Sequence, residues 1–166
     1  EQMNQNSNTS PSESELEVRI NRAVELFNEG YNCSQSVVAA FADLYGFTFE
    51  QSLRMSASFG GGIGRMRQTC GAACGMFLLT GLDCGAIDGS DRAGKSHNYA
   101  QVQQLAAQFK AQNGSLICAE LLGLKPNAPT SSKAEARTTE YYKKRPCPMM
   151  VKTAATIFAN YLKEKR

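Results

Sequence analysis

One segment of this chain limits its fold more than any other. Between Thr69 and about Leu82 the residues are apolar or small on every side, which is typical of a short helix that is buried all round. Gly71 and Gly75 lie one turn apart on this helix and would let a neighbouring helix approach its backbone closely. We therefore expect a Gly/Ala/Cys-rich helix at the centre of the fold, with other helices around it.

The rest of the chain predicts the surrounding helices. Apolar residues recur at helical spacing from residue 14 to about 162, whereas the period-two alternation of strands is essentially missing. Expected starts lie at Ser12 or Ser14, after Asn32, near Phe49 and near Ser96, and after Ser115 and Cys147. The positions expected to face the core are Leu16, Ile20, Ala23, Phe27, Cys33, Val37, Phe41, Leu44, Leu53, Ala57, Val102, Leu105, Ala106, Phe109, Val151, Ala154, Ala155, Phe158 and Leu162. The pattern predicts an all-α protein.

The domain organisation predicted from this pattern is simple. Residues 1–13 are rich in Asn, Ser and Gln and are expected to be a disordered tail. Residues 14–166 are expected to form a single compact bundle of about six to eight helices.

Composition excludes several classes of function. The net charge is only +3 and tryptophan is absent, so nothing predicts nucleic-acid binding. No apolar run reaches the roughly 18 residues of a membrane span. The polar start lacks an apolar leader, which favours the cytoplasm, with an exported form whose N-terminus was processed as the alternative.

Several short features could be mistaken for ligand-binding motifs, but their sequence context does not support that interpretation. The letters of Gly89 to Ser96 fit the phosphate-loop pattern, but no strand precedes them, so we expect a helix start capped by Asp91 or Ser96 and no nucleotide. His97 is the only histidine and is expected to face solvent, and no C-x-x-C-H motif for haem c occurs. The glycine-rich loop from residue 59 to 64 predicts tight turns, with an anion site helped by Arg65 and Arg67 as the weaker alternative.

Three of the six cysteines are predicted to lie where helices begin. Cys33 and Cys70 fall in first helical turns, the latter with Thr69 as a cap, and Cys147 is expected to be a cap itself, followed by Pro148. The N-terminus of a helix favours a thiolate and lowers the thiol pKa. The basic residues 143–145 should act on Cys147 in the same direction.

The sequence does not predict a helix start at the other three cysteines. Cys118 is expected in the middle of a helix, as a buried core residue. Cys74 follows Cys70 by one turn, a spacing that suits a shared metal better than a mutual disulfide. Cys84 is expected in a loop.

Four stretches together resemble the C_GCAxxG_C_C family of redox-active proteins of bacteria and archaea: "YNCSQSV", "GGGIGRM…CGAACG", "CAELLG" and "RPC". The resemblance extends from roughly residue 25 to 147. It implies a helical protein, encoded near transporter or oxidoreductase genes in many genomes. The residues to which it gives a functional role are Cys33, Cys70, Cys118 and Cys147, together with the motif residues Gly71, Ala72 and Gly75 as a cofactor-binding segment. Cys74 falls at a variable position of the motif and Cys84 lies outside it, so neither inherits a role.

Several functions remain open at this point. We expect the four family cysteines to converge near the start of the central helix. They would act either in thiol–disulfide exchange, with Cys70 and Cys147 as low-pKa nucleophiles and Cys33 and Cys118 as resolving partners, or as ligands of an iron–sulfur cluster. The alternatives are a structural zinc module and a non-catalytic accessory protein of a transporter or oxidoreductase, and the helical surface would support a homodimer.

Overall fold

The central segment forms helix α4, and seven further α-helices accompany it in a computed structural model that describes residues 11–165. The α-helices are α1 (Glu13–Asn28), α2 (Cys33–Ala39), α3 (Phe49–Ser56), α4 (Gly71–Cys84), α5 (Arg92–Asn113), α6 (Cys118–Leu121), α7 (Thr139–Lys144) and α8 (Cys147–Glu164). Two 3₁₀ turns, η1 (Ala42–Tyr45) and η2 (Ala57–Phe59), flank α3. No strand occurs among the described residues, so the all-α prediction is confirmed.

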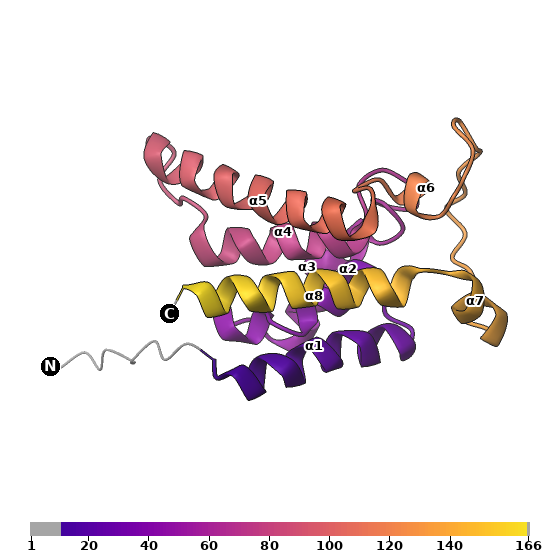
Figure 1. The fold of residues 1–166 in the computed structure, drawn as a ribbon, viewed down its shortest axis with the longest axis horizontal. Coiled ribbons are helices and arrows are strands. Elements are labelled where there is room, and N and C mark those ends of the chain that lie inside the picture. Colours follow the sequence, from indigo (N-terminus) through magenta and orange to yellow (C-terminus); the bar gives the residue numbers. More distant parts are fainter. Residues whose placement is uncertain (1–10, 166) are drawn as a thin grey trace, which may run out of the picture.

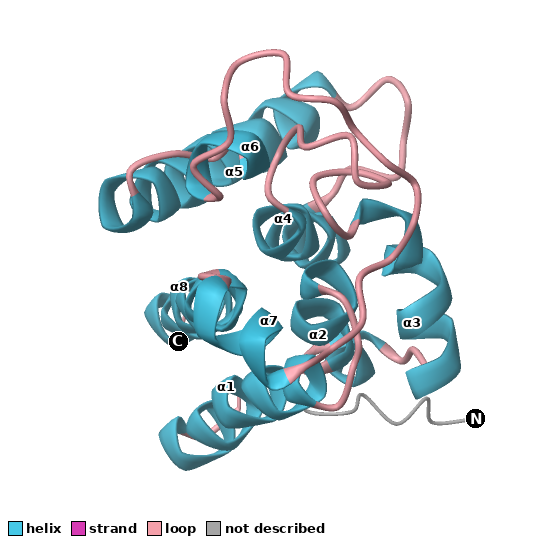
Figure 2. Ribbon diagram, turned by 90° about the vertical axis from the view of Figure 1, so that its right-hand side faces the viewer, coloured by secondary structure: helices cyan, strands magenta, loops and turns pink. Residues whose placement is uncertain are grey.

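Helix α4 lies among the other long helices, as its composition predicts. It packs against α2, α5 and α8, while α1 packs against α2 and α8 (Figures 1 and 2). A Cβ atom on Gly75 would lie 3.0 Å from the carbonyl oxygen of Ser34 and 3.1 Å from Cβ of Val37. Only a glycine therefore lets α2 pack this closely against α4, which confirms the predicted close approach.

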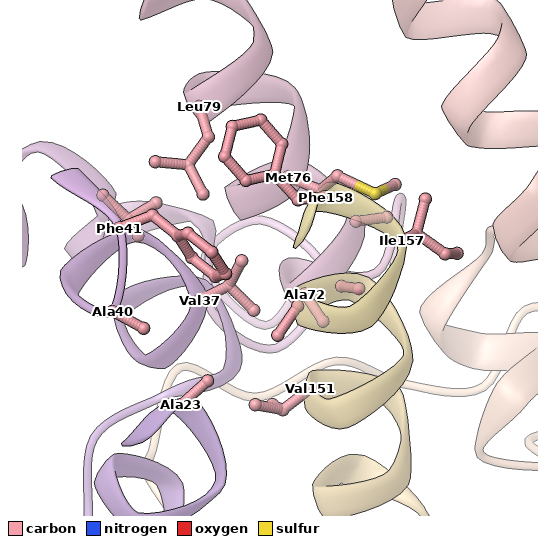
Figure 3. Packing of buried hydrophobic residues seen from close by; sticks show 14 of the residues in the cluster. Ala23, Val37, Ala40, Phe41, Ala72, Met76, Leu79, Val151, Ile157 and Phe158 are labelled. Atoms are coloured by element: carbon pink, nitrogen blue, oxygen red, sulfur yellow. The ribbon is translucent and has the colours of Figure 1, made fainter. Parts of the chain in front are cut away.

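The core is formed where α1, α2, α4 and α8 meet, and Figure 3 shows part of it. All five residues predicted to face inward from α8 are buried. The buried rings of Phe41 and Phe158 meet edge to face, with their centroids 5.1 Å apart. Such a contact ties α8 to the segment between α2 and η1.

Two predicted core positions, Leu44 and Ala57, are exposed, and four others are only half-buried: Ile20, Leu53, Val102 and Ala106. Leu44 is 37% exposed because α2 ends at Ala39 and the chain turns before reaching it. Leu53 on α3 is only half-buried and Ala57, the first residue of η2, is exposed, while the buried positions of α3 are Ser52 and Ser56. The two hydroxyl groups donate to backbone oxygens one turn earlier, at 2.8 and 2.6 Å, so burying them leaves no unpaired polar group.

Most helix boundaries agree with the capping residues that the sequence offers, except that α6 begins at Cys118 and Ser115, expected to cap it, does not. Ser12, Asn32 and Thr48 each begin a helix with a capping box, and Asp91 caps α5, which starts four residues earlier than predicted. Helix α4 extends to Cys84, so this cysteine ends a helix and is not in a loop. The predicted tail lies outside the described residues up to position 10, and the helix after it begins at Glu13.

Helices α6 and α7 and the segment between them gather at one end of the bundle, the right-hand end in Figure 1. Figure 2 views the molecule from this end. Helices α4 and α8 both begin here, so their N-termini point toward the same region. Over residues 11–165, no helix has the length and hydropathy needed to cross a membrane.

Candidate functional site

All four family cysteines occupy the first positions of helices. Cys33, Cys118 and Cys147 are the first residues of α2, α6 and α8, and Cys70 is the N-cap of α4. The predicted positions of Cys70 and Cys147 are therefore wrong by one residue. The prediction of Cys118 in the middle of a helix is wrong as well, because α6 has only four residues and starts at this cysteine.

The four cysteines line one pocket of about 450 Å³ at the α6–α7 end of the bundle. Gly71 lines it too, and a Cβ atom there would lie 2.8 Å from the carbonyl oxygen of Phe59 and 3.4 Å from Cβ of Cys33. Ala72 and Gly75 are buried in the contacts among the helices behind the pocket. Thus the structure brings together four cysteines that are spread over more than a hundred positions of the chain.

A short backbone ladder places Cys70 beside Cys118. Thr69 and Ile117 form an antiparallel bridge. On either side of it, the amide of Cys70 donates to the carbonyl oxygen of Leu116 (2.7 Å) and the amide of Cys118 donates to that of Gln68 (2.6 Å). These bonds fix the start of α4 against the start of α6.

The glycine-rich loop before α4 forms a left-handed turn. Residues 61–65 have φ between 58° and 74°, and Arg67 has a φ of 61°. For Ile63, Arg65 and Arg67 this conformation costs on the order of 1 kcal/mol each or more, a kind of strain that clusters at functional sites. In this conformation, the loop places both Arg65 and Arg67 in the lining of the pocket.

Cys147 and Cys33 both lie in the wall of the pocket and interact as a pair of thiols. Hydrogen bonding from the Cys33 thiol is the largest of the influences that lower the pKa of Cys147 from its ordinary value of 9.0 to about 7. Burial opposes the shift, and the charges of Arg145, Arg137 and Arg67 reinforce it. The pKa of Cys33 is raised well above its ordinary range, first by its hydrogen bond to Cys147 and then by burial. Of the two thiols, Cys147 is therefore the one that ionises first, and Cys33 keeps its proton.

The other two thiols favour the protonated form. Burial raises the pKa of Cys70 to about 12, and the backbone N–H groups of Ala73 and Ala72 only partly oppose it. A low pKa at Cys70 was predicted from its place at the helix start, and this prediction is wrong because desolvation outweighs the helix N-terminus. Burial also raises the pKa of Cys118, against the opposing effect of the Arg67 guanidinium, whose Nη1 lies 3.7 Å from Sγ.

Two further arginines and one acid complete the wall of the pocket. Glu135 forms ion pairs with Arg65 and Arg145, which fastens the irregular segment before α7 across the pocket. Arg137 donates to the carbonyl oxygens of Phe27 (2.7 Å) and Tyr31 (2.8 Å), so it also holds the end of α1. Sequence reasoning missed Glu135 and Arg137 because they lie in a segment without motif or periodicity.

The remaining cysteines and the histidine lie apart from this pair. Cys74 is buried, its pKa is raised by burial to about 11, and its Sγ donates to the carbonyl oxygen of Thr69 at 3.7 Å. Cys84 lies at the opposite end of α4, where it accepts a hydrogen bond from Asn98 Nδ2 at 3.4 Å. His97 is exposed, as predicted.

The chemistry of the four pocket cysteines suits a metal centre, but the positions of their side chains do not. Four cysteines are a ligand set that suits iron–sulfur clusters or zinc. As the side chains stand, however, no three Cys, His, Asp or Glu residues in the described part of the chain are arranged to ligate one ion. All six cysteines are free thiols.

Comparisons with known proteins agree with the cysteine pattern. An archaeal protein from Archaeoglobus fulgidus, called "Uncharacterized protein", is 27% identical over 161 residues, which cover 92% of this chain and 98% of the relative. No solved structure gives a significant match. The family model described as "Putative redox-active protein (C_GCAxxG_C_C)" matches residues 31–161, a region that includes all four pocket cysteines. This chain therefore belongs to the C_GCAxxG_C_C family of redox-active proteins.

Proposed function

We propose that this protein is a thiol–disulfide oxidoreductase in which Cys147 is the nucleophile and Cys33 the resolving thiol. The observation that carries the proposal is the placement of Cys33 and Cys147 together in the pocket wall beside three arginines, where the interaction of the two thiols favours the thiolate at Cys147. A thiolate with a pKa near ambient pH is the most effective attacking group in disulfide exchange. Both thiols line the pocket, but Cys147 is partly exposed there whereas Cys33 is buried.

The reaction proceeds in two exchanges. The Cys147 thiolate attacks one sulfur of a substrate disulfide, which forms a mixed disulfide and releases the other half as a thiolate that takes a proton from water. Cys33 then loses its proton and attacks Sγ of Cys147, which forms the Cys33–Cys147 disulfide and releases the second half of the substrate. The two protein thiols are oxidised by two electrons, and the substrate disulfide is reduced to two thiols.

Cys70 and Cys118 belong to the same redox site in this proposal. The ionised forms of all four pocket thiols influence one another electrostatically, which supports a second dithiol within reach of the first. Cys70 and Cys118 are protonated at neutral pH, so one of them must first lose its proton before it attacks the Cys33–Cys147 disulfide; the second thiol then completes the Cys70–Cys118 bond, and Cys33 and Cys147 are released and take up protons.

The test is to oxidise the fully reduced protein with one equivalent of a small neutral disulfide and to map the disulfides by mass spectrometry. We expect a Cys33–Cys147 bond first, and we expect Cys147→Ser to remove most of the reaction at pH 7. Cys84→Ser is the matched control, because this thiol lies at the other end of α4 and should change nothing. An unchanged reaction rate in Cys147→Ser would overturn the proposal.

A second candidate function is iron–sulfur electron transfer, favoured by the four cysteines around one pocket. Cys33, Cys70, Cys118 and Cys147 would hold the cluster, which would supply one-electron chemistry when bound. Their positions do not fit such ligation without reorientation of the side chains, so the dithiol proposal leads. Charge-transfer bands in the visible spectrum of anaerobically purified protein would reverse this order. Bound zinc with loss of the fold in chelator would instead support the structural zinc module.

The other sequence-based expectations remain predictions. We expect the partner to be a redox protein or a component of a transporter or oxidoreductase. We also expect the protein to form a homodimer and to be located in the cytoplasm.

A further inference from the structure

We propose that the substrate of this site is a low-molecular-weight disulfide that carries a carboxylate, and that Arg67 binds this carboxylate. The inference rests on the proposed function and adds to it the chemical class of the substrate and the residue that selects it.

The charge of the pocket wall favours an anion. Four guanidinium groups line the pocket, on Arg65, Arg67, Arg137 and Arg145, and Glu135 is the single carboxylate among its described lining residues. The positive excess persists when Cys147 is a thiolate. An approaching anion is therefore attracted, although the attacking sulfur alone would repel it.

Three of the four arginines are already engaged. Arg65 and Arg145 share the carboxylate of Glu135, and Arg137 donates to two backbone oxygens at the end of α1. Arg67 differs from them, because no carboxylate among residues 11–165 pairs with it.

The side chain of Arg67 is instead held inside the redox site. Its Nη1 lies 3.7 Å from Sγ of Cys118, and its charge also acts on Cys147. A carboxylate on Arg67 would thus lie beside the thiols while the disulfide of the same molecule faces Cys147. A guanidinium is well suited to this role because it can bind a carboxylate through two parallel hydrogen bonds.

The size of the pocket indicates a small molecule. A volume of about 450 Å³ lies within the range of small-ligand sites. The segment from Ser132 to Glu135 forms part of the wall, held by hydrogen bonds from Arg65 to the backbone oxygens of Ser131 and Lys133. This segment covers part of the pocket, so a disulfide within a folded protein would reach Cys147 less easily than a small molecule would.

Three small disulfides that differ mainly in charge test the inference. They are 3,3′-dithiodipropionate (dianionic), 2-hydroxyethyl disulfide (neutral) and cystamine (dicationic). For each disulfide, the rate of Cys147 oxidation in the reduced protein is divided by the rate at which the same disulfide oxidises a free small thiol. This ratio corrects for differences in the intrinsic reactivity of the three disulfides. We expect a normalised preference for the dianion over the dication of at least about tenfold, decreasing with added salt.

Substitutions at Arg67 identify the source of the preference. Arg67→Gly removes the guanidinium and also suits the positive φ of this position, so a loss of selectivity is not a folding defect. We expect the preference to fall about tenfold in Arg67→Gly and to recover in part in Arg67→Lys. Arg54→Gln is the matched control, since Arg54 is an exposed arginine on α3 and should leave the preference unchanged.

The outcomes separate the two proposals. Equal normalised rates for the three disulfides, or an unchanged preference in Arg67→Gly, would overturn the anionic substrate while leaving thiol–disulfide chemistry in place. Failure of all three disulfides to oxidise Cys147 would overturn the proposed function and, with it, this inference.

Discussion

Replacing Cys33 tests the electrostatic origin of the reactive thiolate. Cys33→Ala removes the S–H donor that contributes most to the low pKa of Cys147, whereas Cys33→Ser keeps a hydrogen-bond donor at the same place. Burial of Cys147, which opposes ionisation, remains in both variants. We therefore expect the pKa of Cys147 to return toward its ordinary value in Cys33→Ala and to stay low in Cys33→Ser.

The magnitude follows from the size of the shift. A rise of the Cys147 pKa from about 7 to 9.0 lowers the thiolate fraction at pH 7 from about one half to about one hundredth. A thiolate of higher pKa is also more nucleophilic, by about six- to tenfold over this interval. The rate at pH 7 should consequently fall about five- to eightfold, while the plateau rate above pH 10 should rise about six- to tenfold.

The assay is the alkylation of Cys147 by iodoacetamide between pH 5 and 11, followed on the Cys147 peptide by mass spectrometry. The profiles of wild type and Cys33→Ala should cross between pH 7 and 9. Because Cys147 in an unfolded chain would also have its ordinary pKa, the circular dichroism spectrum of Cys33→Ala must match that of the wild type, and Cys33→Ser, which keeps a donor, is the matched control. An unchanged midpoint in Cys33→Ala would refute the reasoning and assign the low pKa to the arginines alone.

Three further predictions concern stability. Gly71→Ala should lower the free energy of unfolding by about 1–3 kcal/mol, because the new Cβ would lie 2.8 Å from a backbone oxygen. Gly81→Ala on the same helix meets no atom within 4 Å and should raise the free energy of unfolding by about 0.5–1 kcal/mol. Urea unfolding measures both changes. Ile63→Gly should stabilise the folded protein by up to about 1 kcal/mol, because glycine adopts the positive φ of this position without strain. Ile63→Ala keeps the strain and should therefore not raise the melting temperature. The lowered pKa of Cys147 should make stability rise between pH 7 and 9, since the thiolate is favoured only in the folded protein. The raised pKa of Cys70 should make stability fall between pH 9 and 12, since the unfolded chain then binds fewer protons. Urea unfolding under reductant across this range should show a maximum near pH 9, and Cys147→Ala should lose the rise below it.

Much of the fold follows from local sequence signals. The apolar spacing of α8 identifies its buried face, and Asn32 caps α2 as its position indicates, because both signals act within a few residues. The buried serines of α3 escape such reasoning, since their hydroxyl groups are satisfied by backbone oxygens one turn away and hydrophobicity alone does not reveal this.

The site is less accessible to sequence reasoning, because it depends on contacts between distant segments. The family pattern selects the four pocket cysteines, but it does not separate the thiolate of Cys147 from the protonated thiol of Cys70, which share a place at a helix start. Their difference comes from burial and from a partner thiol at position 33, and neither is local. The left-handed backbone at Arg67 is likewise imposed by the loop as a whole, since arginine has no preference for it.

The place of α8 in the bundle has a consequence for how the protein is made. This helix packs against α1, α2, α4 and α5, and its first residue is Cys147. While residues 147–164 are still within the ribosome, the earlier helices lack a shared wall of their core and Cys33 lacks its partner thiol. The nascent chain thus carries only ordinary, slowly reacting cysteines, and the reactive sulfur arises in the same step that completes the fold.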